Sequence, residues 1–296
     1  IVSMKELLQN ALEGGYAIGY YESWDLYSLE SVLAAAEETA SPAIFGFGGA
    51  ITDQQWLDSW GVKDLTCLAR RMAERSSVPS AVIINEARTI DQIYQALDAG
   101  CNTVMLDCSD KPFKKNVELT SLVVKAAHSY GADVEAELGH LPEGSKSSTG
   151  GKLTNPQQAK EFVESTNINA LAVSIGNAHL VSEGSVNVDL PLLSAIRQAV
   201  DLPLVIHGGS GFPSDAVKPA INFGVAKFNV GTKLKLAFLN AVRTNLPPAD
   251  EEFDVHAFVG SRYQQDFIKS SMNVMKEQIK QLMRLYGSAG KALNDY

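Results

Sequence analysis

Residues 203–209 read PLVIHGG, a run of three large apolar side chains that is followed by a histidine and two glycines. Residues 171–176, LAVSIG, have the same character. A strand that is apolar on both faces is covered on both faces, which is typical of a parallel sheet that lies between helices. The two stretches therefore indicate an α/β protein with a parallel sheet.

Strands and helices alternate along the rest of the chain. Segments with apolar residues at helical spacing, most clearly 29–38 and 116–129, lie between the candidate strands. Eight strand–helix units favour a closed (β/α)8 barrel, the TIM barrel, over a doubly wound sheet, which rarely needs eight regular units. The candidate strands are 16–21, 42–47, 80–85, 103–108, 133–139, 170–176, 203–209 and 227–232.

Two regions fall outside this repeat. Residues 140–155 are long and polar and follow the fifth candidate strand, so we expect a mobile lid over the active end or, alternatively, an ordinary flexible loop. The barrel is expected to span residues 1–245. Residues 246–296 are predicted to form a helical extension, amphipathic over 266–286, that packs on the barrel or on a neighbouring subunit.

Composition limits the classes of partner. The chain has 296 residues with a net charge of −9, which disfavours nucleic acid and anionic membranes but leaves a small anionic substrate possible. Cys67, Cys101 and Cys108 form no CxxC pair, which argues for a reducing compartment. We find neither a signal peptide nor a membrane-spanning run, and therefore expect a cytoplasmic protein.

Polar side chains stand at the carboxyl ends of the candidate strands, where a barrel of this type builds its active site. Imidazole nitrogen and carboxylate oxygen that converge from different strands are what a mononuclear metal site needs. Each histidine alone could be structural, but two at adjacent strand ends favour a metal site. These strand-end residues are Asn85, Glu86, Asp107, Ser109, Glu135, Glu137, His179, His207, Asn229 and Thr232.

The glycines after the seventh and eighth strands form a candidate anion site. Gly208, Gly209 and Ser210 precede a helix that begins near residue 213, and Gly231 and Thr232 close the eighth strand. Glycine lets backbone N–H groups approach an anion closely, and barrels often bind phosphate with these two loops. Ordinary turn chemistry is the alternative explanation for the glycines.

Taken in order, these residues resemble the class II, metal-dependent, ketose-bisphosphate aldolases. The likeness runs through the whole chain and implies a TIM barrel, a catalytic zinc ion, a homodimer or homotetramer, and retro-aldol cleavage of a phosphorylated ketose through an enediolate. The motifs that carry it are WDLYSLESVLAAAEE, VMLDCSDKPFKKN, VEAELG, LAVSIGNAH, LVIHGGSG, KFNVGT and LYGSAGKA.

The resemblance also implies roles for single residues. His179 and His207 match zinc ligands, and Glu137 matches a glutamate that binds or borders the metal. Asp107 and Ser109 match an acidic position and a serine near the metal. The positions that match phosphate- and substrate-binding residues are Gly208, Gly209, Ser210, Asn229 and Thr232.

The chain departs from the family pattern at Asn85-Glu86, where the family has Asp-His. The family aspartate is an acid and base for the substrate hydroxyl, a role that an amide cannot take. Glu86 can replace the histidine as a metal ligand, or it can be the missing base. Glu183 stands where the family has a phosphate-binding lysine, so we expect weaker anion binding, and Glu22 replaces a usual asparagine.

The sequence therefore predicts a divergent, metal-dependent aldolase that is not a standard fructose-bisphosphate aldolase. Asn85, Glu86 and Asp107 are the candidate catalytic residues, and the cofactor is a divalent metal, zinc foremost. A ketose or ketose phosphate is the expected partner, without nucleic acid or membrane. Two alternatives remain open: a metal-dependent sugar-phosphate isomerase or epimerase, and an inactive family member that binds a sugar phosphate.

Overall fold

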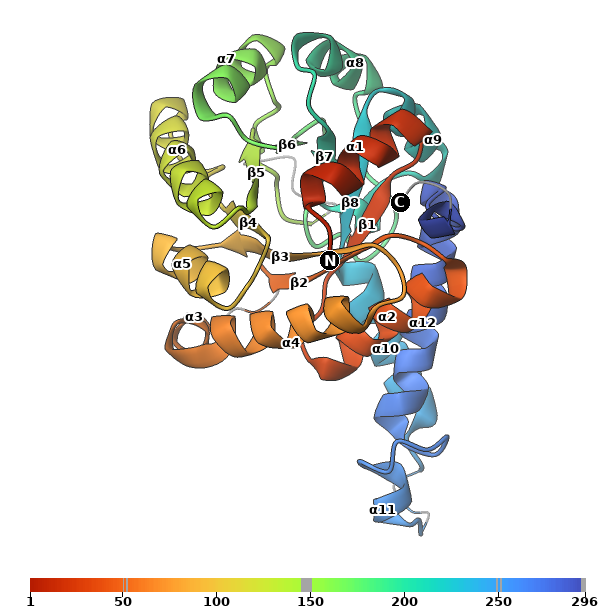
Figure 1. Ribbon diagram of the computed structural model, residues 1–296. Helices are drawn as coiled ribbons and strands as arrows, with labels where there is room; N and C mark the ends of the chain where they lie inside the picture. The colour runs from red at the N-terminus through yellow and green to blue at the C-terminus, as the bar shows by residue number, and fades with distance from the viewer. Residues whose placement is uncertain (50, 52, 145–150, 249, 251, 294–296) are drawn as a thin grey trace.

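The computed structural model describes residues 1–49, 51, 53–144, 151–248, 250 and 252–293. Eight parallel strands pair in chain order and close on themselves, because β1 pairs with both β2 and β8. This closed barrel, drawn in Figure 1, confirms the predicted (β/α)8 class and excludes the doubly wound sheet. The strands are β1 Ile18–Tyr21, β2 Ala43–Gly48, β3 Ser80–Ala87, β4 Thr103–Leu106, β5 Asp133–Leu138, β6 Ala170–Val173, β7 Leu204–Ile206 and β8 Val225–Val230.

A helix follows each strand, and these helices surround the barrel (Figure 1). Several begin at a polar N-cap: the side chains of Asp25, Thr89 and Asn155 each accept a hydrogen bond from a backbone N–H of the first turn. The helices are α2 Leu26–Thr39, α3 Gln54–Trp56, η1 Leu57–Gly61 (a π-helical turn), α4 Val62–Arg75, α5 Ile90–Asp98, α6 Phe113–Ser129, α7 Pro156–Thr166, α8 Leu190–Ala199, α9 Ser214–Asn222 and α10 Thr232–Asn245.

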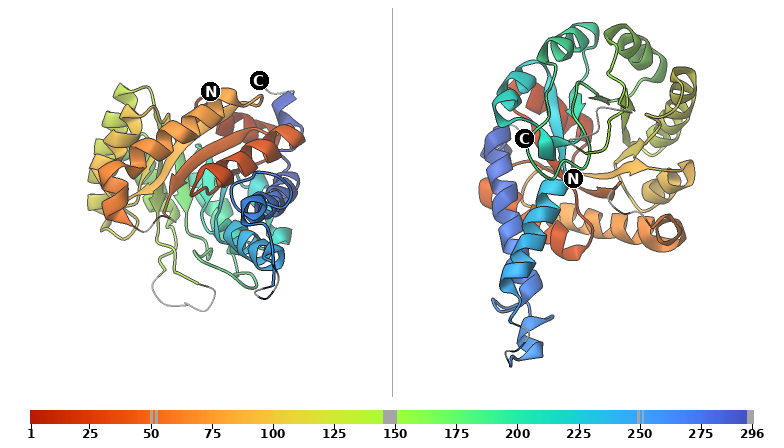
Figure 2. Two further views of the ribbon diagram at one scale, coloured as in Figure 1. Left: turned by 90° about the horizontal axis from the view of Figure 1, so that it is seen from below. Right: turned by 180° about the vertical axis from the view of Figure 1, so that it is seen from behind.

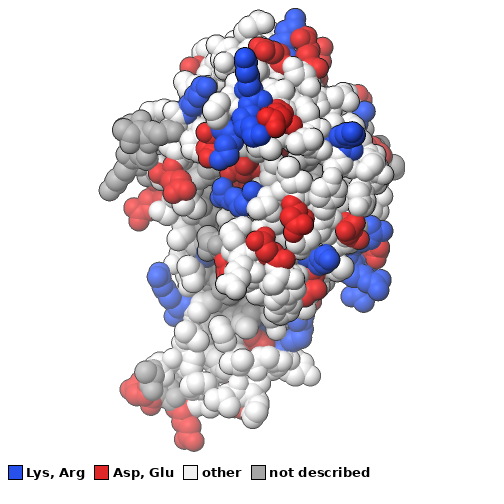
Figure 3. Space-filling model, turned by 90° about the vertical axis from the view of Figure 1, so that its left-hand side faces the viewer, with Lys and Arg blue, Asp and Glu red and all other residues white. Residues whose placement is uncertain are grey.

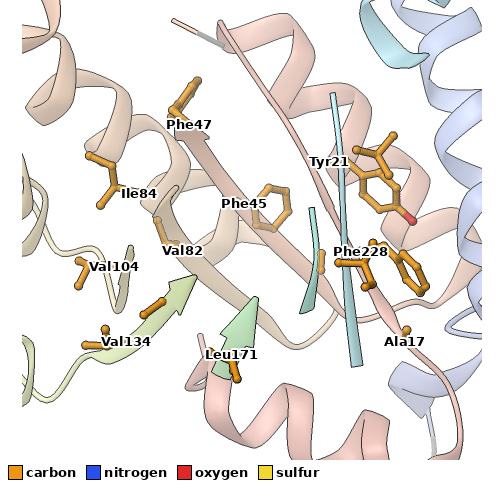
Figure 4. Close-up of a cluster of buried hydrophobic side chains, with 14 of the residues drawn as sticks. Ala17, Tyr21, Phe45, Phe47, Val82, Ile84, Val104, Val134, Leu171 and Phe228 are labelled. Carbon is orange, nitrogen blue, oxygen red and sulfur yellow. The ribbon is translucent and has the colours of Figure 1, made fainter. Parts of the chain in front are cut away.

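Apolar side chains fill two layers. The larger layer lies between strands and helices, and Figure 4 shows part of it, including Phe45, Val82 and Ile84. The smaller layer fills the barrel itself and includes Ala81 and Ile83, the residues that alternate with Val82 and Ile84 along β3. Helix α1, Met4–Gly14, contributes to this inner layer and covers one end of the barrel. The opposite, carboxyl end of the strands is left for polar residues.

The C-terminal segment forms an arm beside the barrel. Helix α12, Phe267–Tyr286, lies along α10 and α2, and the arm extends past the barrel to α11, Val255–Phe258 (Figures 1 and 2). Tyr286 is buried and stacks on Phe228 of β8 at 4.6 Å between ring centroids. The short η3 helix, Lys291–Leu293, follows. The division into units 1–245 and 246–296 stays a prediction.

Charged side chains of both signs are interspersed over the face drawn in Figure 3. None of the helices in the described part of the chain is long and apolar enough to cross a membrane.

Candidate active site

His207 lies directly after β7 and is completely buried among three glutamates. Its Nε2 is 2.9 Å from Glu135 Oε1, and its Nδ1 is 3.1 Å from Glu86 Oε1 and 3.2 Å from Glu137 Oε2. The contacts at Nδ1 lack hydrogen-bond geometry, since Nδ1 has no hydrogen-bond partner among the described residues. The other carboxylate oxygen of Glu137, Oε1, also has no partner among them. Buried polar atoms without hydrogen-bond partners are rare in proteins. These two atoms therefore indicate a binding site for a group that is not part of the chain.

A divalent metal ion fits this corner. Glu86, His179 and His207 each offer one ligand atom, and these atoms all lie within 4.8 Å of one another. Two imidazoles and one carboxylate are a known zinc ligand set. In the neutral tautomer whose Nε2–H donates to the Glu135 carboxylate, the Nδ1 lone pair of His207 is directed at the cluster. The structure therefore brings together three of the four predicted metal ligands, with Glu137 at their border.

The electrostatics of the cluster also call for a cation. Burial disfavours ionisation of Glu86, but His207, His179 and Arg88 together lower the pKa of Glu86 to about 2. Burial alone would lower the pKa of His207, whereas the surrounding glutamates raise it well above its usual value. Carboxylates that crowd one imidazole need a compensating positive charge, which a proton or a metal ion can supply.

Glu86 reaches the cluster through a local change of backbone. Ala81, Ile83 and Asn85 face the interior of the barrel, so strict alternation would point Glu86 outward toward the helices. Instead Glu86 has φ of 55°, and the pairing of β3 with β4 shifts register between Ile84 and Ala87. Such irregularities are frequent next to active sites, where they redirect a side chain. Strand β3 extends to Ala87 and is thus longer than the predicted 80–85.

Gly49 provides space for the Glu86 carboxylate. A Cβ atom at this position would lie 2.0 Å from Glu86 Oε2. The absence of a side chain in the loop after β2 therefore lets the Glu86 carboxylate, on the bulge of β3, occupy this space.

A buried lysine supports the cluster from below. Lys227 Nζ lies 2.8 Å from Glu135 Oε2, and both side chains are fully buried. The charge of Lys227, with the contact to His207, outweighs burial and lowers the pKa of Glu135. Glu135 stays ionised and can accept the Nε2 proton of His207. The sequence pattern placed Glu135 at a strand end without a role, and Lys227 was not predicted, although a lysine within an apolar strand is a signal for a buried ion pair.

The amides of Asn85 and Asn229 meet across the mouth of the barrel. Asn229 Nδ2 donates to Asn85 Oδ1 at 3.2 Å, and both residues are buried. Asn229 Oδ1 has no hydrogen-bond partner within the described chain. Asn229 Oδ1, on the substrate-facing amide pair, can therefore accept a hydrogen bond from a group outside the protein.

Asp107 lies outside the metal-ligand cluster formed by the described residues. Its Oδ2 pairs with Arg88 Nη1 at 3.0 Å, and its Oδ1 accepts hydrogen bonds from the Ser109 backbone and hydroxyl. The Ser109 hydroxyl also lies 3.1 Å from His140 Nδ1. The predicted pair Asp107 and Ser109 therefore forms a rim network with two residues, Arg88 and His140, that sequence analysis did not assign.

The loops after β7 and β8 lie together, as predicted. Gly209 lies against β8, since a Cβ there would lie 2.8 Å from Asn229 O. Gly208 has φ of 69°, and a Cβ there would lie 2.1 Å from Ala178 O, so the close approach of the loop after β6 requires glycine. Ser210 Oγ accepts a hydrogen bond of 3.0 Å from Lys233 N, in the first turn of α10. Gly231 is the N-cap residue of α10, and Thr232 begins the helix.

The base of the predicted lid positions His179. Gly144 N donates to His179 O, and His179 N donates to Pro142 O, at 2.7 and 2.9 Å. His140 and Lys152 form an antiparallel bridge that joins the two ends of the segment. Residues 145–150, on which the lid prediction chiefly rests, lie outside the described residues.

Comparison with known proteins shows similarity over nearly the whole chain. The family model described as "Fructose-bisphosphate aldolase class-II" matches residues 2–291. Fructose-bisphosphate aldolase of Geobacillus stearothermophilus is 33% identical over 297 residues, and the protein named "Probable fructose-bisphosphate aldolase" of Bacillus subtilis (strain 168) is 32% identical over 296, with 99% of each chain covered in both cases. The crystal structure of the YdjI aldolase from Escherichia coli K12 superimposes with a TM-score of 0.82 at 32% identity, and 99% of each chain is covered.

Proposed function

Because the chain belongs to the class II fructose-bisphosphate aldolase family, we propose that it is a metal-dependent aldolase. In this proposal it cleaves a carbon–carbon bond of a ketose or ketose phosphate through an enediolate. The observation that carries the proposal is the convergence of Glu86, His179 and His207 at the carboxyl ends of three strands. Convergence of metal-ligand side chains at this end of a barrel is characteristic of an active site rather than of a structural feature.

The metal would be held by Glu86, His179 and His207, with Glu137 at its border. When bound, a divalent ion such as Zn²⁺ supplies Lewis-acid polarisation of the substrate carbonyl oxygen. We assign Glu86 the role of ligand rather than base, because its Oε1 lies 3.1 Å from the lone-pair nitrogen of His207. Two charged or polar groups that are this close without a hydrogen bond are better explained by a shared ion.

The chain must also move a proton from a substrate hydroxyl. Asn85 can hold this hydroxyl by a hydrogen bond, but its amide cannot accept the proton. Glu137 Oε1 is buried in the site and has no hydrogen-bond partner among the described residues, so we assign it this proton. Asp107 is less suited, since both of its oxygens already accept hydrogen bonds.

Loss of the family aspartate supports a departure from standard fructose-bisphosphate cleavage. General acid–base assistance contributes roughly 10²–10⁴-fold to a rate, and Asn85 cannot provide it at its own position. The same observation favours, as second candidates, an isomerase or epimerase that uses only enediolate chemistry, or an inactive sugar-phosphate-binding protein. Release of an aldehyde fragment distinguishes the aldolase from both.

The test combines metal analysis with a substrate screen. Purified protein is expected to contain about one zinc per chain and to release an aldehyde from at least one ketose or ketose phosphate. The Glu86→Ala variant should lose both the metal and the activity, while Glu183→Ala, an exposed carboxylate after β6, should keep the metal. Full metal content and full activity in Glu86→Ala would refute the assigned site.

We also propose that the chain assembles into a homodimer or homotetramer through the C-terminal arm. Exposed apolar side chains gather on this arm, and Figure 3 shows it largely without charged groups apart from carboxylates near its tip. Large exposed apolar areas mark interaction surfaces. The residues concerned are Leu246, Phe253, Val255, Val259 and Tyr263.

Light scattering during gel filtration measures this assembly. The expected mass is two or four times the chain mass of 31.9 kDa. A Val255→Asp, Val259→Asp variant should shift toward the monomer, whereas Leu122→Asp, an exposed leucine of α6, should leave the mass unchanged. A wild-type monomer would contradict the proposal.

A further inference from the structure

Two buried residues contact His207 at the ring nitrogen that does not face the metal-ligand cluster. His207 Nε2 lies 2.9 Å from Glu135 Oε1, and Lys227 Nζ donates to Glu135 Oε2 at 2.8 Å. All three side chains are buried. They form a continuous series of polar contacts inside the barrel, here called the buried triad, which runs from Lys227 through Glu135 to the imidazole.

Lys227 determines how the two oxygens of Glu135 are used. An ammonium group has three N–H donors and no acceptor, so Lys227 can hydrogen-bond to Glu135 only through an oxygen. Its Nζ also lies over the Tyr20 ring, 5.2 Å from the ring centroid, where a cation is favoured. The carboxylate accepts from Lys227 with Oε2 and presents Oε1, a second acceptor, to the imidazole.

An acceptor at Nε2 fixes the tautomer of His207. A neutral imidazole carries one proton, which lies on one of its two ring nitrogens. Beside an acceptor that has no hydrogen to donate, the proton lies on Nε2, and Nδ1 keeps its lone pair. Nδ1 is the nitrogen that lies 3.1 Å from Glu86 Oε1 and 3.2 Å from Glu137 Oε2. Because a metal ion binds the nitrogen that has the lone pair, the tautomer decides whether His207 can act as a ligand in the cluster.

We propose that Lys227 is a positioning residue for the metal site: it acts through Glu135 to hold His207 in the tautomer that offers Nδ1 to the cluster. This proposal rests on the metal site proposed above, and it does not depend on which reaction the protein catalyses. It gives a function to a lysine whose burial inside the barrel is unfavourable by itself.

Glu135→Gln tests the proposal, because it keeps the shape of the side chain and changes one acceptor into a donor. Lys227 can only donate and therefore takes the amide oxygen, which turns the NH₂ group toward Nε2. Nε2 must then accept, so the ring proton moves to Nδ1 and faces the cluster. Loss of a supporting partner typically lowers metal affinity about 10–100-fold, and we expect a loss of this size in the zinc affinity. Competition with a chromogenic chelator at neutral pH measures it.

Two further variants separate the tautomer from the loss of charge. Glu135→Met removes the same charge but has no N–H group, so it should bind zinc at least about threefold more tightly than Glu135→Gln. In the double variant Glu135→Gln, Lys227→Met, the amide is free to turn its oxygen toward Nε2, and most of the lost zinc affinity should return. If charge alone mattered, Glu135→Met and Glu135→Gln would bind zinc equally weakly. Thermal melting shows which variants are folded.

A zinc affinity of Glu135→Gln within about threefold of the wild type would overturn the proposal. A double variant that binds zinc no better than Glu135→Gln would also overturn it. If the Glu135 variants do not fold, nitrogen-15 NMR of zinc-loaded, histidine-labelled wild type decides: the proton of His207 should lie on Nε2 and the metal on Nδ1, and the reverse would refute the proposal. A wild type that binds no zinc would refute the metal site and this inference together, whereas the other outcomes refute this inference alone.

Discussion

Glu86 and His207 meet with 3.1 Å between Oε1 and Nδ1, although the alternation of β3 would turn Glu86 away from the barrel. The left-handed backbone of Glu86, with φ of 55°, makes the contact possible. A non-glycine residue in this conformation is strained by about 1 kcal/mol or more. The contact between these two residues therefore indicates that Glu86 is held beside His207 for function, at some cost in stability.

Gly49→Ala should weaken metal binding without unfolding the protein. The added Cβ would lie 2.0 Å from Glu86 Oε2 and must displace that carboxylate. Loss of a supporting contact of a metal ligand typically lowers metal affinity about 10–100-fold. Competition with a chromogenic chelator measures the affinity, and thermal melting confirms that the barrel is intact. Unchanged zinc affinity would show that Glu86 is not a ligand.

Lys227→Met should destabilise the protein strongly, because it leaves the Glu135 carboxylate buried without its partner. Breaking a buried ion pair in this way costs about 3–5 kcal/mol. Adding Glu135→Gln removes the unpaired charge and should recover a large part of the loss. Urea unfolding of both variants and of the wild type measures these free energies. A double variant as unstable as Lys227→Met would mean that lost packing of the lysine, rather than the buried charge, dominates.

The double variant Asn85→Asp, Glu86→His restores the pair found in the family and should raise cleavage of fructose or tagatose bisphosphate. The aspartate can exchange a proton with the substrate hydroxyl, an effect worth roughly 10²–10⁴-fold. The wild type should cleave both sugars far below a typical rate on the order of 10 s⁻¹. A coupled assay for the triose phosphate product measures the rates. Wild-type cleavage at the typical rate would contradict the account of Asn85.

Helix α12 should be held mainly by apolar packing and only weakly by its ion pairs. Met283 is fully buried, and Met283→Ala should cost about 2–5 kcal/mol of unfolding free energy. Glu38 of α2 pairs with Lys276 and Lys280 of α12, but its side chain is 42% exposed, so Glu38→Gln should cost less than about 1 kcal/mol. Urea unfolding at neutral pH compares the two variants. A larger loss in Glu38→Gln would reverse this ranking.

The small contribution of Glu38 should also depend on pH. Hydrogen bonds from Lys276 and Lys280 lower the pKa of Glu38 in the folded protein. The stabilisation is therefore present above the pKa of an unfolded glutamate and is lost as the pH falls through the lower, folded value. The difference in stability between wild type and Glu38→Gln should shrink over that acidic range. A constant difference would show that the ion pairs do not act through the charge of Glu38.

The sequence by itself determined the barrel and the strand ends that carry polar residues. Apolar runs such as 203–209 and their regular alternation with helical segments are local patterns, and periodicity reports the local chain directly. The same assignment of strands predicted that His179 and His207 lie at adjacent strand ends. The family resemblance predicted the metal, and it showed that the chain departs from the family pattern at Asn85-Glu86.

Only the tertiary structure decided which groups meet. The bulge that turns Glu86 inward is a departure from periodicity, so no periodic pattern predicts it. Lys227 of β8 forms an ion pair with Glu135 of β5, although the two residues are far apart in the sequence. Asp107 pairs with Arg88 and does not join the metal-ligand cluster. Glu22 reaches Gly231 because closure of the barrel brings the first strand beside the eighth. Contacts between strand ends depend on the geometry of closure, and this geometry is a property of the whole chain that no single segment contains.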